Sequence, residues 1–124
     1  MDESIMKPLQ SVKGYLGAAI NNYTGECSVC NVQRLSLNVE ETSATFNDML
    51  RDSHKVSKNL KLSATKIMEI QTLKGKVIKV IRGCSGEDAK VHLHIYAMFS
   101  DDGDVALGKM VINKMLPQAV DAMR

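Results

Sequence analysis

The positions of apolar residues predict a long helix in the middle of the chain. From Val39 onward the large apolar side chains recur three, four or seven positions apart, as on one helical face, at Phe46, Met49, Leu50, Val56 and Leu60. Asn38 is a suitable N-cap, and two glutamates follow it in the first turn, where carboxylates interact favourably with the helix dipole. A helix is therefore predicted over Val39–Asn59.

This apolar stripe has two interpretations. Its residues can be core residues that cover a sheet, or some of them can also lie at a dimer seam. A stripe wider than one sheet contact needs would suit a helix that touches two partners. The same face carries small side chains that allow a neighbouring backbone or helix to come close, at Thr42, Ser43, Ser53 and Ser57.

Two further helices are predicted near the ends of the chain. Helical spacing over residues 2–12 predicts a short helix with Pro8 in its first turn, or a longer kinked one. Helical spacing returns over residues 105–123, after a polar loop whose end is expected to be the N-cap. Pro117 lies inside that segment, so a kink or an early end is expected there.

Five segments have strand character. Residues 15–21 and 26–30 flank a turn rich in Asn and Gly, which predicts a hairpin. Residues 67–72, 77–82 and 91–100 are separated by glycine-containing turns and predict a three-stranded meander; the last of them alternates with a period of two. The order α-β-β-α-β-β-β-α predicts an α+β fold: a five-stranded antiparallel sheet with two long helices on one face plus a short N-terminal helix.

Length and composition fit a single domain over residues 1–124. Only 4% of residues are aromatic, so the core is expected to be aliphatic with methionines as gap-fillers. The charge is nearly balanced at +2 with no basic stripe, which disfavours nucleic acid as a partner. No apolar run is long enough for a membrane span, and the start lacks a signal-peptide pattern. Three cysteines are an odd number for a disulfide framework. A cytoplasmic protein is therefore expected.

Read together, the order of elements and several short motifs resemble the Roadblock/LC7 domain family, which includes Roadblock-type dynein light chains and MglB-like proteins. The matching stretches are residues 9–20 (LQSVKGYLGAAI) with the turn ending at Gly25, residues 70–78 (IQTLKGKVI) and residues 103–108 (GDVALG). The resemblance covers nearly the whole chain. Asn22 stands where the family commonly has an acidic residue.

The resemblance implies a profilin-like fold and a non-catalytic function, without catalytic residues or a cofactor. Such domains form homodimers or heterodimers, often through the third strand and the central helix, and they regulate or anchor small Ras-like GTPases or attach cargo to motors. The expected dimer interface consists of Phe46, Met49, Leu50, Val56, Ile67, Met68 and Ile70.

An alternative function is a thiol- or metal-dependent sensor that uses Cys27, Cys30, Cys84, His92 and His94. Cys27 and Cys30 form a C-x-x-C motif, but a strand period of two would point them to opposite faces, and a zinc site needs a second ligand pair. Structural thiols are the favoured interpretation. For the two histidines, a half-exposed sheet face or one covered by a partner is favoured over a metal site.

Overall fold

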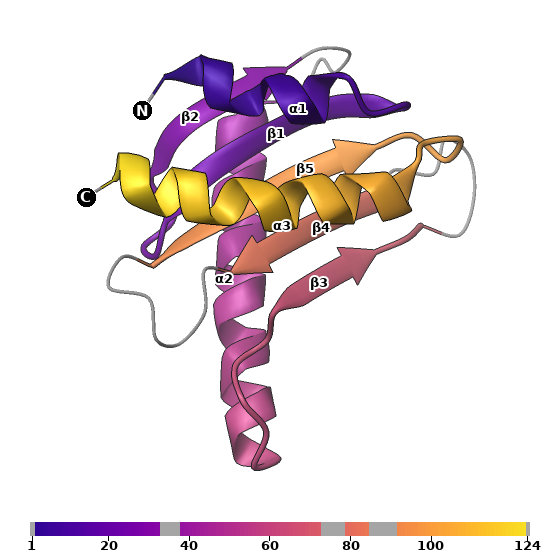
Figure 1. The fold of residues 1–124 in the computed structure, drawn as a ribbon. Helices are drawn as coiled ribbons and strands as arrows, with labels where there is room; N and C mark the ends of the chain where they lie inside the picture. Colours follow the sequence, from indigo (N-terminus) through magenta and orange to yellow (C-terminus); the bar gives the residue numbers. More distant parts are fainter. Residues whose placement is uncertain (1, 33–37, 73–78, 85–91, 124) are drawn as a thin grey trace.

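The computed structural model describes residues 2–32, 38–72, 79–84 and 92–123, with the backbone alone for residues 79–84. Its elements in chain order are the 3-10 helix η1 (Glu3–Met6), α1 (Lys7–Gln10), β1 (Tyr15–Asn22), β2 (Cys27–Val32), α2 (Val39–Asn59), β3 (Ile67–Ile70), β4 (Lys79–Cys84), β5 (Leu93–Phe99) and α3 (Val105–Ala122) (Figure 1). The α+β class is confirmed. The second turn was predicted over residues 83–88, but Gly83 and Cys84 belong to β4, so the prediction is wrong for these two residues. The rest of that turn, the predicted turn at 73–76 and the first residues predicted for the fourth and fifth strands lie outside the described residues.

All strand pairs in the sheet are antiparallel, and the order is β2-β1-β5-β4-β3. β1 and β5 lie in the middle and pair with each other from Tyr15 opposite Phe99 to Asn22 opposite Leu93. β2 and β3 are the two edge strands among the described elements. The strand that precedes α2 and the strand that follows it are thus at opposite edges of the sheet.

The two long helices lie on opposite faces of the sheet, so the prediction of both on one face is wrong. α3 covers one face together with η1 and α1, and α2 crosses the other face (Figure 1). The reason is visible in β5, whose seven residues are all buried. Leu93 and Phe99 belong to the cluster beneath α3, whereas Tyr96 and Met98 pack on the α2 side. A strand that is apolar on both faces needs cover on both.

The helix ends follow local sequence signals. The Asn38 side chain accepts a hydrogen bond from the Glu41 amide at 3.1 Å, and Asp104 accepts one from the Leu107 amide at 3.1 Å. Pro8 lies in the first turn of α1, where its missing N–H costs no helical hydrogen bond. The expected early end at Pro117 does not occur, because α3 continues to Ala122 with Pro117 on its exposed side.

Among the described helices, none combines the length and the apolar character that crossing a membrane requires.

Candidate protein-interaction surface

α2 has two faces with different neighbours. Its buried face packs on the sheet and consists of Val39, Ser43, Asn47, Leu50 and His54. Beside it lies a second, exposed row of large apolar residues: Met49 is 41% exposed, Val56 59% and Leu60 65%. These three residues are seven and four positions apart, which places them on one side of the helix. We call Met49, Val56 and Leu60 the apolar stripe.

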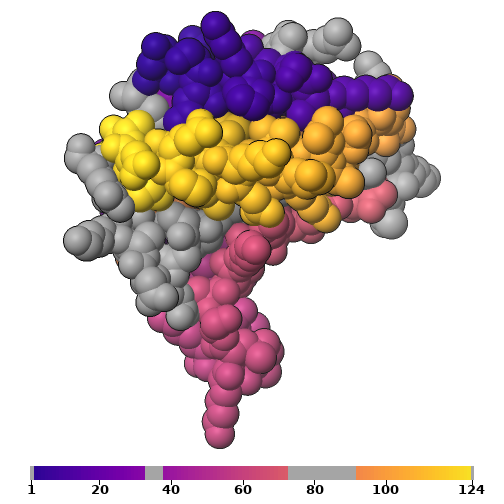
Figure 2. All heavy atoms as spheres, in the orientation of Figure 1, coloured from indigo at the N-terminus to yellow at the C-terminus, as the bar shows by residue number. Residues whose placement is uncertain are grey.

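The C-terminal half of α2 extends beyond the sheet. In Figure 1 this half lies past β3, and in Figure 2 it forms a narrow projection with the segment that follows it. His54 is the last buried residue of the helix, and Leu62 in the following segment is 61% exposed. Apolar side chains that stay in water give up the free energy of burial, about 25 cal/mol per Å² of apolar surface. The stripe is therefore a candidate contact surface.

β3 provides an open strand edge next to the stripe. It pairs with β4 on one side, from Ile67 opposite Gly83 to Ile70 opposite Val80, and no described strand lies on its other side. Its side chains alternate: Ile67 packs on the α3 side, and Ile70 joins the cluster beneath α2. Phe46 of α2 packs against the same cluster as Ile70. Unpaired strand edges are ready templates for pairing with another chain.

Three α2 side chains hold the segment between α2 and β3. The Ser53 hydroxyl donates to the Thr65 hydroxyl at 3.0 Å, and the Ser57 hydroxyl lies 3.2 Å from it. The Thr65 amide donates to Nδ1 of His54 at 2.9 Å. A backbone N–H needs an acceptor, so His54 carries no proton on Nδ1 in this arrangement. These contacts fix β3 relative to α2 and thereby set the geometry of the candidate surface.

The end of α2 is closed by a Schellman motif. The Leu62 amide donates to the Ser57 carbonyl at 2.9 Å, and the Lys61 amide donates to the Lys58 carbonyl at 2.9 Å. Lys61 has a φ of 61°, the left-handed conformation that usually selects glycine at this position.

Replacing Lys61 by glycine is expected to stabilise the protein by about 1 kcal/mol, because it removes the cost of a left-handed non-glycine residue. Urea unfolding at one fixed protein concentration measures the change. Lys55→Gly is the control: it lies inside the same helix and is expected to destabilise by about 1 kcal/mol. A loss of stability in Lys61→Gly would contradict the capping geometry.

The structure separates the seven residues predicted for the interface. Met49 and Val56 are exposed, and Phe46, Ile67, Met68 and Ile70 are partly buried. Leu50 is fully buried against the protein's own core, so its assignment to the interface is wrong. One position separates Met49 from Leu50, and the 100° rotation per residue is enough to turn one side chain to solvent and the other to the sheet.

The polar part of the buried face of α2 was not predicted from the sequence. The Asn21 amide donates to the Ser43 hydroxyl at 3.0 Å, and Asn47 donates to the Tyr23 carbonyl at 3.0 Å. Asn47 also contacts Nδ1 of His94, which is fully buried. Polar residues carry no hydrophobic signal, although Ser43, Asn47 and His54 do continue the helical spacing of Val39 and Leu50.

The histidines occupy different environments. His94 lies beneath the protein's own α2, whereas His92 is exposed and its ring lies 6.0 Å from that of Tyr23. The expected half-exposed or partner-covered face is therefore wrong for His94. Among the residues that the structure describes, no group of three or more His, Cys, Asp or Glu side chains could hold a metal ion.

Cys27 and Cys30 lie on the same face, which corrects the prediction of opposite faces. The register between β1 and β2 shifts at Ile20 and Asn21, so that Cys30 lies opposite Ala19 and Cys27 opposite Asn21. Such a bulge inserts one extra residue and resets the alternation. Both thiols face the cluster beneath α2. The side chain of Cys84 is outside the described part of the structure.

Burial raises the pKa of the Cys27 thiol to about 12, and the adjacent Cys30 thiol contributes to the shift. Because the thiolate is the reactive form and its fraction at pH 8 falls by roughly a thousandfold, alkylation of Cys27 by iodoacetamide is expected to be at least about a hundredfold slower than that of a free thiol. Peptide-resolved mass spectrometry of the folded protein measures the rate. Labelling as fast as that of glutathione in the same buffer would contradict the expected protection.

The acidic loop before α3 is a turn and a helix cap, as predicted. Asp104 caps α3, and the Ser100 hydroxyl donates to the carboxylate of Asp102.

Comparison with known proteins places this geometry among known folds. No protein-family model matches the sequence, and no curated protein matches it. Solved structures do match. A Roadblock/LC7 domain from Streptomyces avermitilis aligns with a TM-score of 0.77 over 98% of this chain and 97% of that chain, at 6% identity.

Two structures of MglB are similarly close. One, described as having a tetrameric arrangement, aligns with a TM-score of 0.76 over 96% of this chain and 84% of that chain, at 11% identity. MglB from Myxococcus xanthus aligns with a TM-score of 0.71 over 98% of this chain and 89% of that chain, at 8% identity. Identities this low concern the fold alone. The resemblance seen in the sequence is thus confirmed at the level of architecture: the chain has the Roadblock/LC7 fold.

Proposed function

We propose that this protein is a non-catalytic interaction module that forms a homodimer. The observation that carries the proposal is the apolar stripe of α2 beside the open edge of β3, since each feature is unfavourable in an isolated molecule. One arrangement satisfies both. Two copies related by a two-fold axis pair their β3 strands and pack their projecting α2 helices together.

The proposed interface combines two kinds of contact. Pairing of β3 with its copy supplies backbone hydrogen bonds, as in other strand-addition complexes. Packing of Met49, Val56 and Leu60 supplies apolar burial, and Met68 and Ile70 lie on the same side of the sheet as α2. The contacts of Thr65 with α2 hold these two components in a fixed relation before the partner binds. Such preorganisation lowers the entropic cost of association.

The class of partner comes from the resemblance to the Roadblock/LC7 family. It implies that the dimer binds or regulates a small Ras-like GTPase or a related signalling or motor component, which would place it in the cytoplasm. The shared fold supports this proposal.

Two experiments test these parts separately. Sedimentation velocity at low micromolar concentration is expected to give a dimer, twice the chain mass of 13.6 kDa; a monomer throughout would contradict the dimer. Affinity capture from native lysate, followed by nucleotide-exchange and hydrolysis assays on any GTPase recovered, tests the partner. A dimer that never captures a GTPase would leave the module without its proposed target class.

No observation favours the alternative of a thiol- or metal-dependent sensor. The raised pKa of Cys27 works against a reactive thiolate, and the described residues contain no three-ligand group.

A further inference from the structure

The side of α2 opposite the apolar stripe is basic. Arg51, Lys55 and Lys58 are four and three positions apart, so at roughly 100° per residue they share one face, about half a turn away from the stripe. Residues 51–66 contain five lysine or arginine residues against the single acid Asp52. The net charge of this segment is therefore +4, whereas the whole chain carries +2. The positive charge is concentrated on the projecting C-terminal half of α2 and the segment that follows it.

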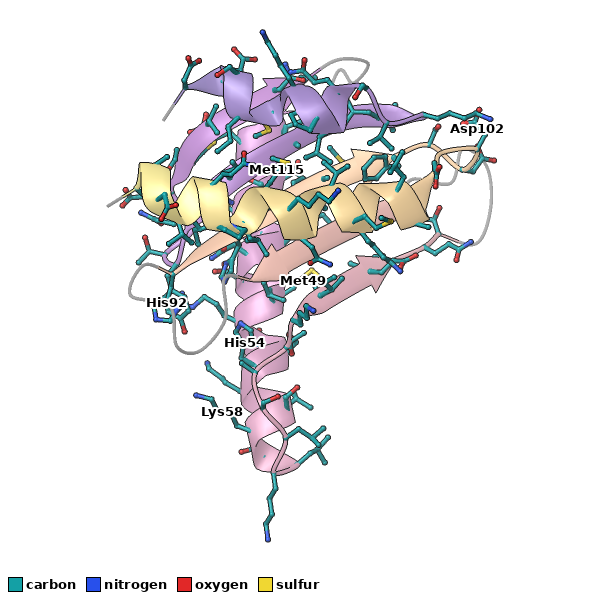
Figure 3. All side chains as sticks on the ribbon, viewed as in Figure 1. Met49, His54, Lys58, His92, Asp102 and Met115 are labelled. Atoms are coloured by element: carbon teal, nitrogen blue, oxygen red, sulfur yellow. The ribbon has the colours of Figure 1, made fainter. Side chains whose placement is uncertain are left out.

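Arg51 is held in place by an aromatic ring. Its guanidinium carbon lies 4.9 Å from the centre of the Tyr23 ring, and Tyr23 is 44% exposed. His92 also contacts Tyr23, and the two rings meet edge-on. The Tyr23 backbone is anchored in turn, because Asn47 of α2 donates to its carbonyl. Figure 3 shows Lys58 and His92 on the same side of α2.

Within the described ranges, the positive charges on this face have little acidic compensation. Among the described residues, no carboxylate lies within ion-pair distance of Arg51 or Lys58. Lys55 and Asp52 are 3.8 Å apart, and both side chains are more than three-quarters exposed, so their pairing is weak. As far as the described side chains go, an incoming anionic group would not have to displace a strong ion-pair partner.

We infer that Tyr23, Arg51, Lys55, Lys58 and His92, here called the Tyr23–Arg51 surface, bind an acidic segment of a partner protein. A planar guanidinium fixed by stacking presents its donors in the geometry that carboxylates accept in pairs. Arg51 to Lys58 spans roughly 10 Å along the helix, the length of about three extended residues. Tyr23 is exposed and Arg51 is partly exposed, and tyrosine and arginine are residue types enriched at protein contacts.

A bilayer fits this surface less well. Peripheral helices insert an apolar face while basic side chains at its margins reach the headgroups. Here the basic face and the apolar stripe lie on opposite sides of one helix, so a flat membrane cannot contact both. The inference rests on the proposed function in treating the chain as an interaction module, and it specifies the chemistry of the partner.

The test uses a fluorescein-labelled peptide of ten glutamates as the probe, with fluorescence anisotropy at 50 mM and 300 mM NaCl. Arg51→Gln is expected to weaken binding about fivefold, and the triple variant Arg51→Gln, Lys55→Gln, Lys58→Gln is expected to abolish it. Lys114→Gln on α3 removes the same charge from the other face and should change binding less than twofold. Equal losses in Arg51→Gln and Lys114→Gln, or no binding at 50 mM NaCl, would overturn the inference.

Two further experiments compare other classes of partner with the peptide and locate the binding site. Tighter binding to phosphatidylserine vesicles or to single-stranded DNA than to the peptide would overturn the inference in favour of those partners. In a titration followed by amide NMR, the peptide is expected to shift residues 22–25, 51–58 and 92–94; shifts confined to other regions would also overturn it.

The outcome is separable from that of the dimer. Arg51 lies away from the apolar stripe, so Arg51→Gln should sediment as wild type does. Loss of peptide binding with an intact dimer supports the Tyr23–Arg51 surface, whereas a monomeric wild-type protein contradicts the proposed function and leaves the peptide titration interpretable.

Discussion

The double substitution Val56→Asp, Leu60→Asp is expected to convert the dimer into a monomer. Both side chains are more than half exposed, so the fold of one copy should survive the change. In the dimer the same positions would be buried, and their loss costs about 3 kcal/mol or more even before the aspartates are desolvated. This corresponds to at least a hundredfold weaker association. Size-exclusion chromatography with light scattering measures the mass across a dilution series.

The matched control is Leu107→Asp, Met110→Asp on α3. These residues are also large, apolar and exposed, but they lie on the opposite side of the sheet from α2. The control should remain dimeric at every concentration at which the wild type is dimeric. If both double variants dissociate, the loss of the dimer would reflect surface charge in general. If neither does, the apolar stripe is not the interface.

Gly14→Ala is expected to destabilise the protein by about 3 kcal/mol or more. Gly14 has a φ of +83°, which is unfavourable for any residue with a Cβ. An added Cβ would also lie 2.4 Å from Cα of Gly103 and 2.7 Å from the Ser100 hydroxyl. The Gly14 carbonyl accepts from the Ser100 amide at 2.9 Å, so the two segments cannot separate without losing that hydrogen bond. The costs of backbone strain and of overpacking therefore add in the free energy of unfolding.

Gly25→Ala separates these two contributions. Gly25 also has a positive φ, +98°, but the nearest atom to an added Cβ is Nδ2 of Asn47 at 3.4 Å, which is an ordinary contact. Its expected cost is about 1 kcal/mol from the backbone alone. Chemical denaturation at a single protein concentration compares the two, since dimerisation makes stability concentration-dependent. Equal losses would mean that the close packing at Gly14 is not rigid.

Local structure was largely predictable from the sequence. α2 begins and ends where the apolar period and the Asn38 cap indicate, and the alternation along β5 places Leu93 and Tyr96 on opposite faces as expected. These signals depend only on nearby residues. Pro117 is the instructive exception: a helix packed along its length tolerates the loss of one hydrogen bond at an exposed position.

The placement of helices on the two faces was not predictable in this way. The pattern of β5 has apolar residues on both faces, through Tyr96 and Met98 as well as Leu93 and Phe99. Those residues already implied cover on both sides, but the histidines interleaved with them suggested a polar face. The sequence did not reveal that Asn47 of α2 is a polar partner for the buried His94. A buried histidine that has a polar partner cannot be distinguished from an exposed one by its neighbours in sequence.

The candidate surface was only partly predictable for a related reason. Sequence spacing identified the stripe but not which members face the sheet, so Leu50 was grouped with Met49 and Val56. The boundary between core and exposed surface is set by the angle at which α2 crosses the sheet. Likewise, the relation of Cys27 to Cys30 depends on a bulge that leaves no composition signal.

Isotope-filtered NMR on a mixture of unlabelled protein and protein labelled with carbon-13 and nitrogen-15 tests the proposed dimer most directly, because it reports only contacts between copies. Intermolecular NOEs are expected from the methyl groups of Met49, Val56 and Leu60, and between the amides of β3 in the two copies. Intermolecular contacts confined to α3 or to β2, or their absence at concentrations where the mass is that of a dimer, would contradict the proposal.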